Sequence, residues 1–229
     1  MRAGLADPER VGLQRIMPTR RVKASVPDLI PDRLTLPAIR DAAKDCQACD
    51  LYKLGTQTVF GEGAKKAALM LVGEQPGDQE DIAGHPFVGP AGKLLDKALA
   101  QAGIDRTTVY VTNVVKHFKW EPRGKRRIHK KPDTGEIDAC RWWLDNELAI
   151  VQPNVVVALG ATAARAVMHK VVTINANRGR LIELPDHRRA VITVHPSYLL
   201  RLLEDRDKQR EFDRLVKDLR FAAEAARQD

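Results

Sequence analysis

Four short runs of apolar residues stand at intervals along the chain. Each run is rich in Val, Ile or Leu, which is typical of strands that are covered on both faces. The runs are Ala67–Val72, Val109–Val115, Val155–Leu159 and Ala190–Val194. We therefore predict four strands of a mostly parallel sheet.

Apolar residues recur at helical spacing in the segments between and around these runs. The predicted helices are Leu36–Ala48, Ala91–Ala102, Ile137–Ile150, Ala161–His169 and a charged amphipathic helix at about Glu204–Ala226. Strands that alternate with helices indicate an α/β fold. We expect a three-layer α/β/α sandwich with a central, mostly parallel four-stranded sheet.

Three groups of polar residues follow the ends of the predicted strands. Gly73–Asp78 follows the first strand, Asn113 comes at the end of the second, and His195–Ser197 follows the fourth. Ligand sites of parallel sheets lie at the carboxyl ends of the strands. We therefore expect the three groups to converge on one cleft.

Composition narrows the class of protein. Hydrophobic residues make up 44% of the 229 residues, which excludes a fully disordered chain. No apolar run reaches the roughly 18–20 residues of a membrane span, and the N-terminus lacks the apolar stretch of a secretory signal. Three cysteines suit a reducing compartment, so we expect a cytoplasmic protein. The net charge of +8 favours a polyanionic partner.

The N-terminal segment lacks the periodicity of the rest. Residues 1–33 hold seven Arg or Lys, four Asp or Glu and four prolines. We interpret this segment as a flexible basic tail or linker, with a DNA-binding arm as the alternative. A single domain is predicted over residues 34–229.

Four motifs together resemble the uracil-DNA glycosylase superfamily, and above all its iron–sulfur group, family 4. They are Gly73–Asp78, Pro86–Gly92, Val111–Asn113 and His195–Ser197. The resemblance covers roughly Asp45 to Ala223. Within that group, Gln75 and the Lys-Arg-Arg-Ile-His sequence of Lys125–His129 look like the UdgX subclass. Members of that subclass bind uracil-containing DNA and become covalently joined to it.

The cysteines are candidate metal ligands. Cys46 and Cys49 form a C-x-x-C pair, which alone is compatible with redox chemistry, zinc or an inert role. The resemblance implies a [4Fe–4S] cluster, and His117 stands where family 4 carries a further cysteine. We expect Cys46, Cys49, His117 and Cys140 to hold this cluster in a structural role. The alternative is a zinc site, with His117 facing DNA.

A pocket for an extruded uracil needs a stacking face and a group that reads one edge of the base. Phe87 is the candidate stacker, and the Asn113 amide offers both a donor and an acceptor. Alternatively, Phe87 is a core residue and Asn113 caps a strand. Gln75 and the backbone of Gly77 are further candidates for binding uracil.

Two side chains are candidates for cleavage of the glycosidic bond. His195 would contact the base and donate a hydrogen bond to the departing uracil anion, and Glu74 would stabilise positive charge on the sugar. Without the neighbouring motifs, Glu74 would pass for an exposed carboxylate in a turn.

The segment from Lys116 to Lys131 carries eight Lys or Arg and one Glu. We predict a loop beside the phosphate backbone of DNA, although charge runs more often form a solvated face. The residues expected to bind DNA are Lys125, Arg126, Arg127, Lys130 and Ser197.

His129 ends the basic motif. A neutral imidazole is a competent nucleophile, and a neighbouring carboxylate can orient it. We predict that His129 attacks C1′ of the sugar, so that the enzyme is consumed. Arg127 is expected to position the loop or to assist charge stabilisation. The alternative is a contact between His129 and a phosphate.

These inferences predict a uracil-DNA glycosylase that excises uracil and traps itself on the abasic site in a single turnover. The alternatives are a multiple-turnover family 4-like glycosylase and a non-catalytic iron–sulfur module that binds nucleic acid. Single-stranded DNA should be preferred because no base pair has to open. We expect a monomer with no membrane partner.

Overall fold

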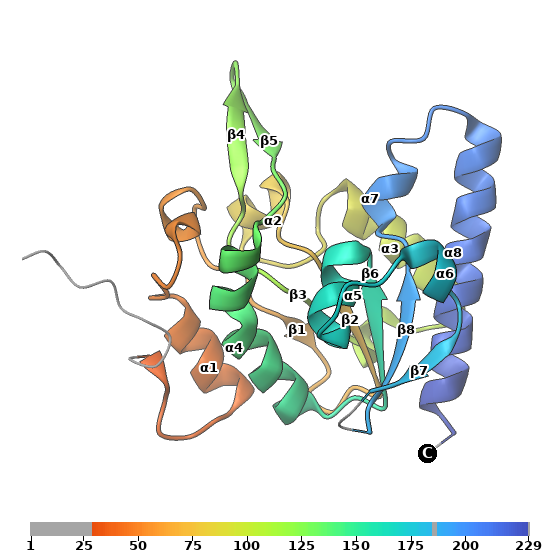
Figure 1. The fold of residues 1–229 in the computed structure, drawn as a ribbon, viewed down its shortest axis with the longest axis horizontal. Coiled ribbons are helices and arrows are strands. Elements are labelled where there is room, and N and C mark those ends of the chain that lie inside the picture. The colour runs from red at the N-terminus through yellow and green to blue at the C-terminus, as the bar shows by residue number, and fades with distance from the viewer. Residues whose placement is uncertain (1–28, 185–186, 229) are drawn as a thin grey trace, which may run out of the picture.

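A computed structural model describes residues 29–184 and 187–228, and it contains a mixed sheet between two layers of helices (Figure 1). The strand order is β1-β3-β2-β6-β8-β7. The four central strands run parallel and are β3 (Tyr110–Asn113), β2 (Leu69–Gly73), β6 (Val155–Leu159) and β8 (Arg189–Thr193). The predicted α/β class and mostly parallel sheet are therefore confirmed.

The sheet has six strands where four were predicted. The additional strands, β1 (Glu62–Gly63) and β7 (Leu181–Glu183), pair antiparallel with the two edges. Both are very short and neither is fully buried. They carry no apolar run, because an edge strand need not be covered on both faces.

Side chains of the central strands alternate between two hydrophobic cores. In β2, Met70 and Val72 pack in the core with α1 (Leu36–Ala43), α4 (Thr134–Val151) and α5 (Ala161–Met168). Leu69 and Leu71 pack in the opposite core with α3 (Pro90–Gln101) and α8 (Asp205–Ala226). Both faces are covered, so every residue of β2 and β6 is buried.

The predicted helices form, with shifted ends. Helix α1 ends at Ala43, so the C-x-x-C pair lies in the turn beyond it. Helix α4 starts at Thr134 because Asp133 caps it and forms a capping box with Glu136. The shorter helices are α2 (Asp78–Ala83), α6 (Ile174–Asn177), α7 (Pro196–Leu199), and the 3-10 turns Asp50–Lys53 and Arg106–Thr108.

The basic segment is not a loop, as predicted, but contains an antiparallel hairpin. Strands β4 (Trp120–Arg123) and β5 (Arg126–His129) pair around a turn at Gly124, whose φ is 60°. The hairpin stands at the edge of the sheet where the parallel strands end (Figure 1). Its strands are largely exposed, so they lack the apolar alternation that reveals a half-buried strand.

Most of the predicted N-terminal tail lies outside the described residues, which begin at Leu29. Leu29 itself packs against the core. Across residues 29–184 and 187–228, no helix combines the length and the apolar character needed to cross a membrane.

Candidate active site

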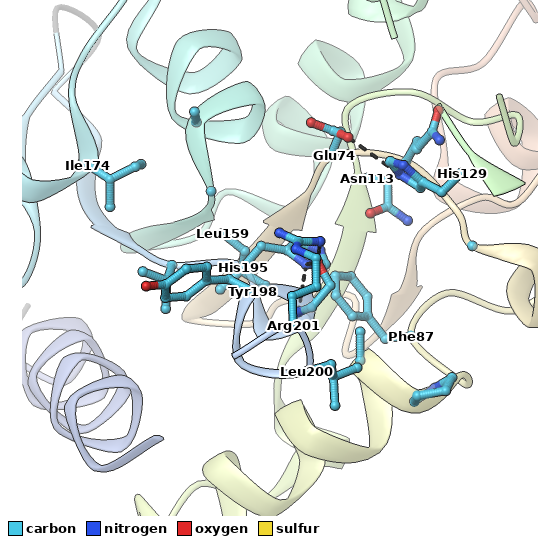
Figure 2. Close-up of a pocket in the computed structure, with 18 of the residues that line it drawn as sticks. Glu74, Phe87, Asn113, His129, Leu159, Ile174, His195, Tyr198, Leu200 and Arg201 are labelled. Atoms are coloured by element: carbon cyan, nitrogen blue, oxygen red, sulfur yellow. Dashed lines mark hydrogen bonds and ion pairs between the residues drawn. The ribbon is translucent and has the colours of Figure 1, made fainter. Parts of the chain in front are cut away.

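A cavity of about 750 Å³ opens at the carboxyl ends of the central strands (Figure 2). It brings together polar groups from three strand ends and from the hairpin. Eight of the predicted site residues line it: Glu74, Gln75, Gly77, Phe87, Asn113, His129, His195 and Ser197. The predicted Lys125, Arg126, Arg127 and Lys130 do not line it.

Asn113 and Phe87 meet over Gly73 at one wall of the cavity. A Cβ atom on Gly73 would lie 2.3 Å from Asn113 Oδ1 and 2.7 Å from Phe87 Cζ, so only glycine permits this approach. Both side chains are buried. Phe87 packs in the core with α3 and also lines the cavity, so a core position does not remove it from the pocket wall.

His195 is held as a neutral ring with a defined donor. Its Nδ1 accepts a hydrogen bond from the Ser197 backbone N–H at 3.1 Å, and its ring stacks on Phe87 with 6.0 Å between centroids. Burial lowers the pKa of His195 to about 4, so the imidazole is neutral at pH 7. Because Nδ1 accepts, the ring proton resides on Nε2, which is left to donate.

Glu74 lies between His129 and Thr162. Its Oε1 is 3.5 Å from His129 Nε2, and Thr162 donates a hydrogen bond to Oε2. Burial lowers the pKa of His129 although Glu74 opposes that shift, so the imidazole keeps a free lone pair at neutral pH. The carboxylate thus faces a neutral, half-exposed histidine.

Thr162 was not predicted from the sequence. It lies in the first turn of α5, directly after the carboxyl end of β6. The signal that could have found it is its position, because the polar groups that line the cavity also follow the ends of parallel strands.

The Gln75 side chain forms hydrogen bonds with the backbone at the base of the hairpin. Its Nε2 donates to the carbonyl oxygens of Lys119 and Lys130, both at 3.1 Å, and its Oε1 accepts from the Lys119 N–H at 3.2 Å. Gln75 lines the cavity, but backbone groups occupy its amide. The predicted donor Gly77 is likewise engaged, since its N–H donates to Glu80 at 3.1 Å.

Arg127 ties the hairpin to α2. Its Nε donates to Asp78 Oδ1 at 2.6 Å and its guanidinium donates to the fully buried Asp81 at 2.7 Å. The guanidinium also lies over the rings of Phe118 and Trp120. The structure therefore gives Arg127 a role in positioning the strand that carries His129.

Half of the basic side chains in segment 116–131 are paired within the protein. Lys116 is buried 2.5 Å from Glu147, so its assignment to a DNA-facing run was wrong. Lys119 forms ion pairs with Asp133 and Glu136. Arg127 pairs with Asp78 and Asp81, and Lys130 pairs with Glu121. Within the described residues, no ion pair engages Arg123, Lys125, Arg126 or Lys131, and all four are exposed.

The three cysteines lie where the turn after α1 packs against helix α4. Cys46 and Cys49 belong to the turn, and Cys140 belongs to the helix. Hydrogen bonding with Cys140 lowers the pKa of Cys49 to about 7, so a thiolate is accessible at neutral pH. Cys140 is buried, and its pKa is raised by the Cys49 contact and by desolvation. The Trp143 indole N–H donates to Cys46 Sγ at 3.3 Å. These are soft donors suited to iron or zinc.

His117 is buried but is engaged elsewhere. Its Nε2 lies 3.1 Å from Thr58 Oγ1, and burial lowers its pKa to about 4. Among the described residues, no group of three or more His, Cys, Asp or Glu side chains has the arrangement of a site for a single metal ion. The thiols fit a metal centre in chemistry, whereas His117 would have to leave Thr58 to join them.

Comparison with known proteins agrees with this geometry. Residues 60–220 match the family model of the uracil DNA glycosylase superfamily. A type-4 uracil-DNA glycosylase of Thermotoga maritima is 39% identical over 184 residues, which cover 76% of this chain and 92% of the relative. One of Archaeoglobus fulgidus is 38% identical over 162 residues, or 68% of this chain and 78% of the relative. The chain therefore belongs to the uracil-DNA glycosylase superfamily.

Proposed function

We propose that the protein excises uracil from DNA and becomes covalently joined through His129 to C1′ of the abasic sugar, as in the UdgX subclass. The observation that carries the proposal is the pairing of a neutral His129 with Glu74 at the mouth of a pocket that also holds Asn113 and His195. The relatives named type-4 uracil-DNA glycosylases support the glycosylase part of the proposal.

Recognition of the base rests on Asn113 and Phe87. The Phe87 ring packs against one face of the extruded uracil. The Asn113 amide, held over Gly73, presents a donor and an acceptor to the edge at which uracil and cytosine differ. A buried amide left unpaired by the wrong base costs binding energy, which gives selectivity.

Cleavage transfers the electron pair of the C1′–N1 bond to uracil. The His195 Nε2–H donates a hydrogen bond to the developing uracil anion, while the Glu74 carboxylate stabilises positive charge on the sugar. The lone pair of His129 then forms a bond to C1′. The imidazolium so formed loses one proton and the uracil anion takes up one, so the reaction is balanced without water.

We further propose that Cys46, Cys49 and Cys140 hold a [4Fe–4S] cluster, with His117 as the fourth ligand once it releases Thr58. When bound, the cluster supplies a structural cross-link between the turn after α1, the segment that follows β3, and α4. The convergence of the thiols and the thiolate-accessible Cys49 support this assignment.

Cys140→Ala should therefore lose iron and stability. We expect iron content to fall to less than about half, and the melting temperature to fall by roughly 6–12 °C for a loss of about 3 kcal/mol. Absorbance near 400 nm, iron assay and thermal unfolding measure this. After iron is removed with a chelator, wild type and variant should melt alike. Stoichiometric zinc in a colourless wild-type protein would contradict the iron assignment.

DNA is held by the exposed part of the hairpin. Arg123, Lys125, Arg126 and Lys131 are available for phosphates, and the exposed Lys130–Glu121 pair exchanges at little cost. Single-stranded DNA is preferred because no base pair must open.

Asn113→Asp should separate base reading from DNA binding. The carboxylate keeps the size of the amide but removes its donor, so we expect uracil excision to fall by roughly 10²–10³. Affinity for a matched thymine oligonucleotide should change by less than about threefold, because the phosphate contacts remain. Uracil release and fluorescence anisotropy measure the two effects. Equal losses in both would show that Asn113 does not read the base.

The proposed function is tested by incubating the protein with a uracil-containing oligonucleotide, followed by denaturing electrophoresis and assay of free uracil. We expect one uracil released per protein and a complex that survives heat and detergent. Repeated release of uracil without such a complex would indicate a multiple-turnover glycosylase. Binding without release would indicate a non-catalytic module.

A further inference from the structure

The cavity extends well beyond the groups that would hold uracil. Glu74, Asn113 and His129 lie at one end, Ile174 lies at the other, and His195 and Tyr198 lie between them (Figure 2). A volume of about 750 Å³ is in the range of pockets for drug-sized ligands and exceeds what one nucleobase needs. The second part has no role in the cleavage described above.

This second part, here termed the far lobe, consists of the lining residues around Ile174. They are Asn175 and Arg178 of the α6 segment, the ion-paired Glu211 and Arg214, and Tyr198 at the boundary with the uracil end. It combines an aromatic ring, an aliphatic side chain and an exposed amide. Tyr198 is 39% exposed, so a face of its ring is available. Such a set of groups suits a flat aromatic ligand with a polar edge.

Arg178 offers an unsatisfied donor in the wall of the far lobe. Its side chain is only 4% exposed and is fixed by Asp218 at 2.7 Å and Glu211 at 2.6 Å. Its remaining guanidinium nitrogen is buried and has no hydrogen-bond partner within the described residues. Buried donors are rarely left unpaired, so an acceptor atom would gain a hydrogen bond here once a small rotation of the guanidinium exposes this nitrogen.

The charges of the far lobe favour a neutral ligand. Arg178 is neutralised by Asp218 and Glu211, and Glu211 also pairs with Arg214 at 2.8 Å. Two cations thus face two anions, so a phosphate would gain little net attraction. A nucleobase is neutral and carries carbonyl and ring-nitrogen acceptors.

We propose that the far lobe binds the base of a nucleotide adjacent to the uracil in the same strand, stacked on Tyr198 with its polar edge toward Arg178 and Asn175. This inference rests on the proposed function, because it needs a uracil at the opposite end of the cavity. The strand continues from the extruded nucleotide, and its neighbouring base is free to enter only where it is unpaired. The far lobe therefore contributes to the preference for single-stranded DNA.

The experiment uses three single-stranded oligonucleotides of equal length with one deoxyuridine at the centre, the 5′ end or the 3′ end. Affinity relative to matched thymine oligonucleotides is measured by fluorescence anisotropy in the Glu74→Gln background, where the covalent step is suppressed. We expect one of the two terminal placements, the one that lacks the neighbour, to weaken uracil-dependent binding by roughly 5- to 100-fold, as for one lost base stack.

The variants then locate the effect. Tyr198→Ala should weaken binding by a similar factor only for the two oligonucleotides that keep the neighbouring base. Tyr198→Phe, which keeps the aromatic ring, should bind them as the wild type does. The dependence on salt should not change, since no phosphate contact is lost. Asn175→Trp, at an exposed position, should block the lobe and reproduce the Tyr198→Ala pattern. Leu203→Ala, at a residue 90% exposed and outside the cavity, should change nothing.

Equal affinity for the three uracil placements would overturn the proposal. The proposal would also be overturned if Tyr198→Ala weakened binding of all three oligonucleotides by the same factor. That result would show that the substitution acts by disturbing the turn that holds His195. If Tyr198→Ala does not fold, the Asn175→Trp pattern decides. Uracil release and adduct formation by wild type are scored separately, so failure of the proposed function is distinguishable from failure of the far lobe.

Discussion

Replacing His129 with Ala should abolish the heat-stable complex while uracil is still released. His129 is the half-exposed imidazole that faces Glu74, and alanine leaves C1′ without a protein nucleophile. We expect adduct formation to fall by roughly 10³-fold or more. Release should stay within roughly tenfold, because His195 and Glu74 still stabilise the departing base and the sugar. Water can occupy the vacated space, so the variant should turn over.

Denaturing electrophoresis and uracil release measure this result, and peptide mapping of the wild-type complex should place the modification on His129. His85→Ala is the matched control, since His85 is an exposed histidine paired with Glu62 outside the cavity. A heat-stable complex formed by His129→Ala would exclude His129 as the nucleophile. A Schiff base from Lys125, Lys130 or Lys131 would then be tested by its need for borohydride.

Replacing Glu74 with Gln should slow both uracil release and adduct formation by roughly 10²–10³. The amide keeps the shape of the carboxylate and can still accept from Thr162, so the change removes chiefly the negative charge. That charge acts on the cationic sugar, before or during the attack by His129. Cleavage and trapping should therefore fall together.

Single-turnover time courses of both products measure the effect, with Glu62→Gln as the control at an exposed carboxylate outside the cavity. A Glu74→Gln protein that releases uracil at the wild-type rate but fails to trap would show that Glu74 serves only His129. An unchanged rate of both would remove Glu74 from the mechanism.

The sheet and its main helices were accessible from the sequence because their signals are local. The central strands are covered on both faces, so each appears as a continuous apolar run. The position of the cavity was accessible as well, since parallel strands bring Glu74, Asn113 and His195 to one edge. The exposed hairpin was not, because its strands pair through backbone hydrogen bonds and carry no alternation of apolar and polar residues.

The roles of particular side chains depended on contacts across the chain. Lys116 belongs to a basic run in the sequence, yet it is buried against Glu147, 31 residues away. Gln75 looks like a pocket residue, yet its amide is engaged by the backbone of Lys119 and Lys130. A sequence motif shows which groups are near one another along the chain, not which of them already have partners.

The amino-acid pattern alone predicts the layered α/β architecture, the strand ends that form the cavity and the residue types available there. Those features follow from hydrophobic periodicity and from short-range turns, which neighbouring residues encode. Three contacts became apparent only in the folded chain: Thr162 orients Glu74, Arg127 holds the hairpin against Asp81, and Arg178 keeps a donor that has no partner among the described residues. Neighbouring residues do not encode these contacts, because a hydrogen bond is directional and acts over only a few ångströms. Its partners are therefore set by the packing of segments that are distant in the sequence.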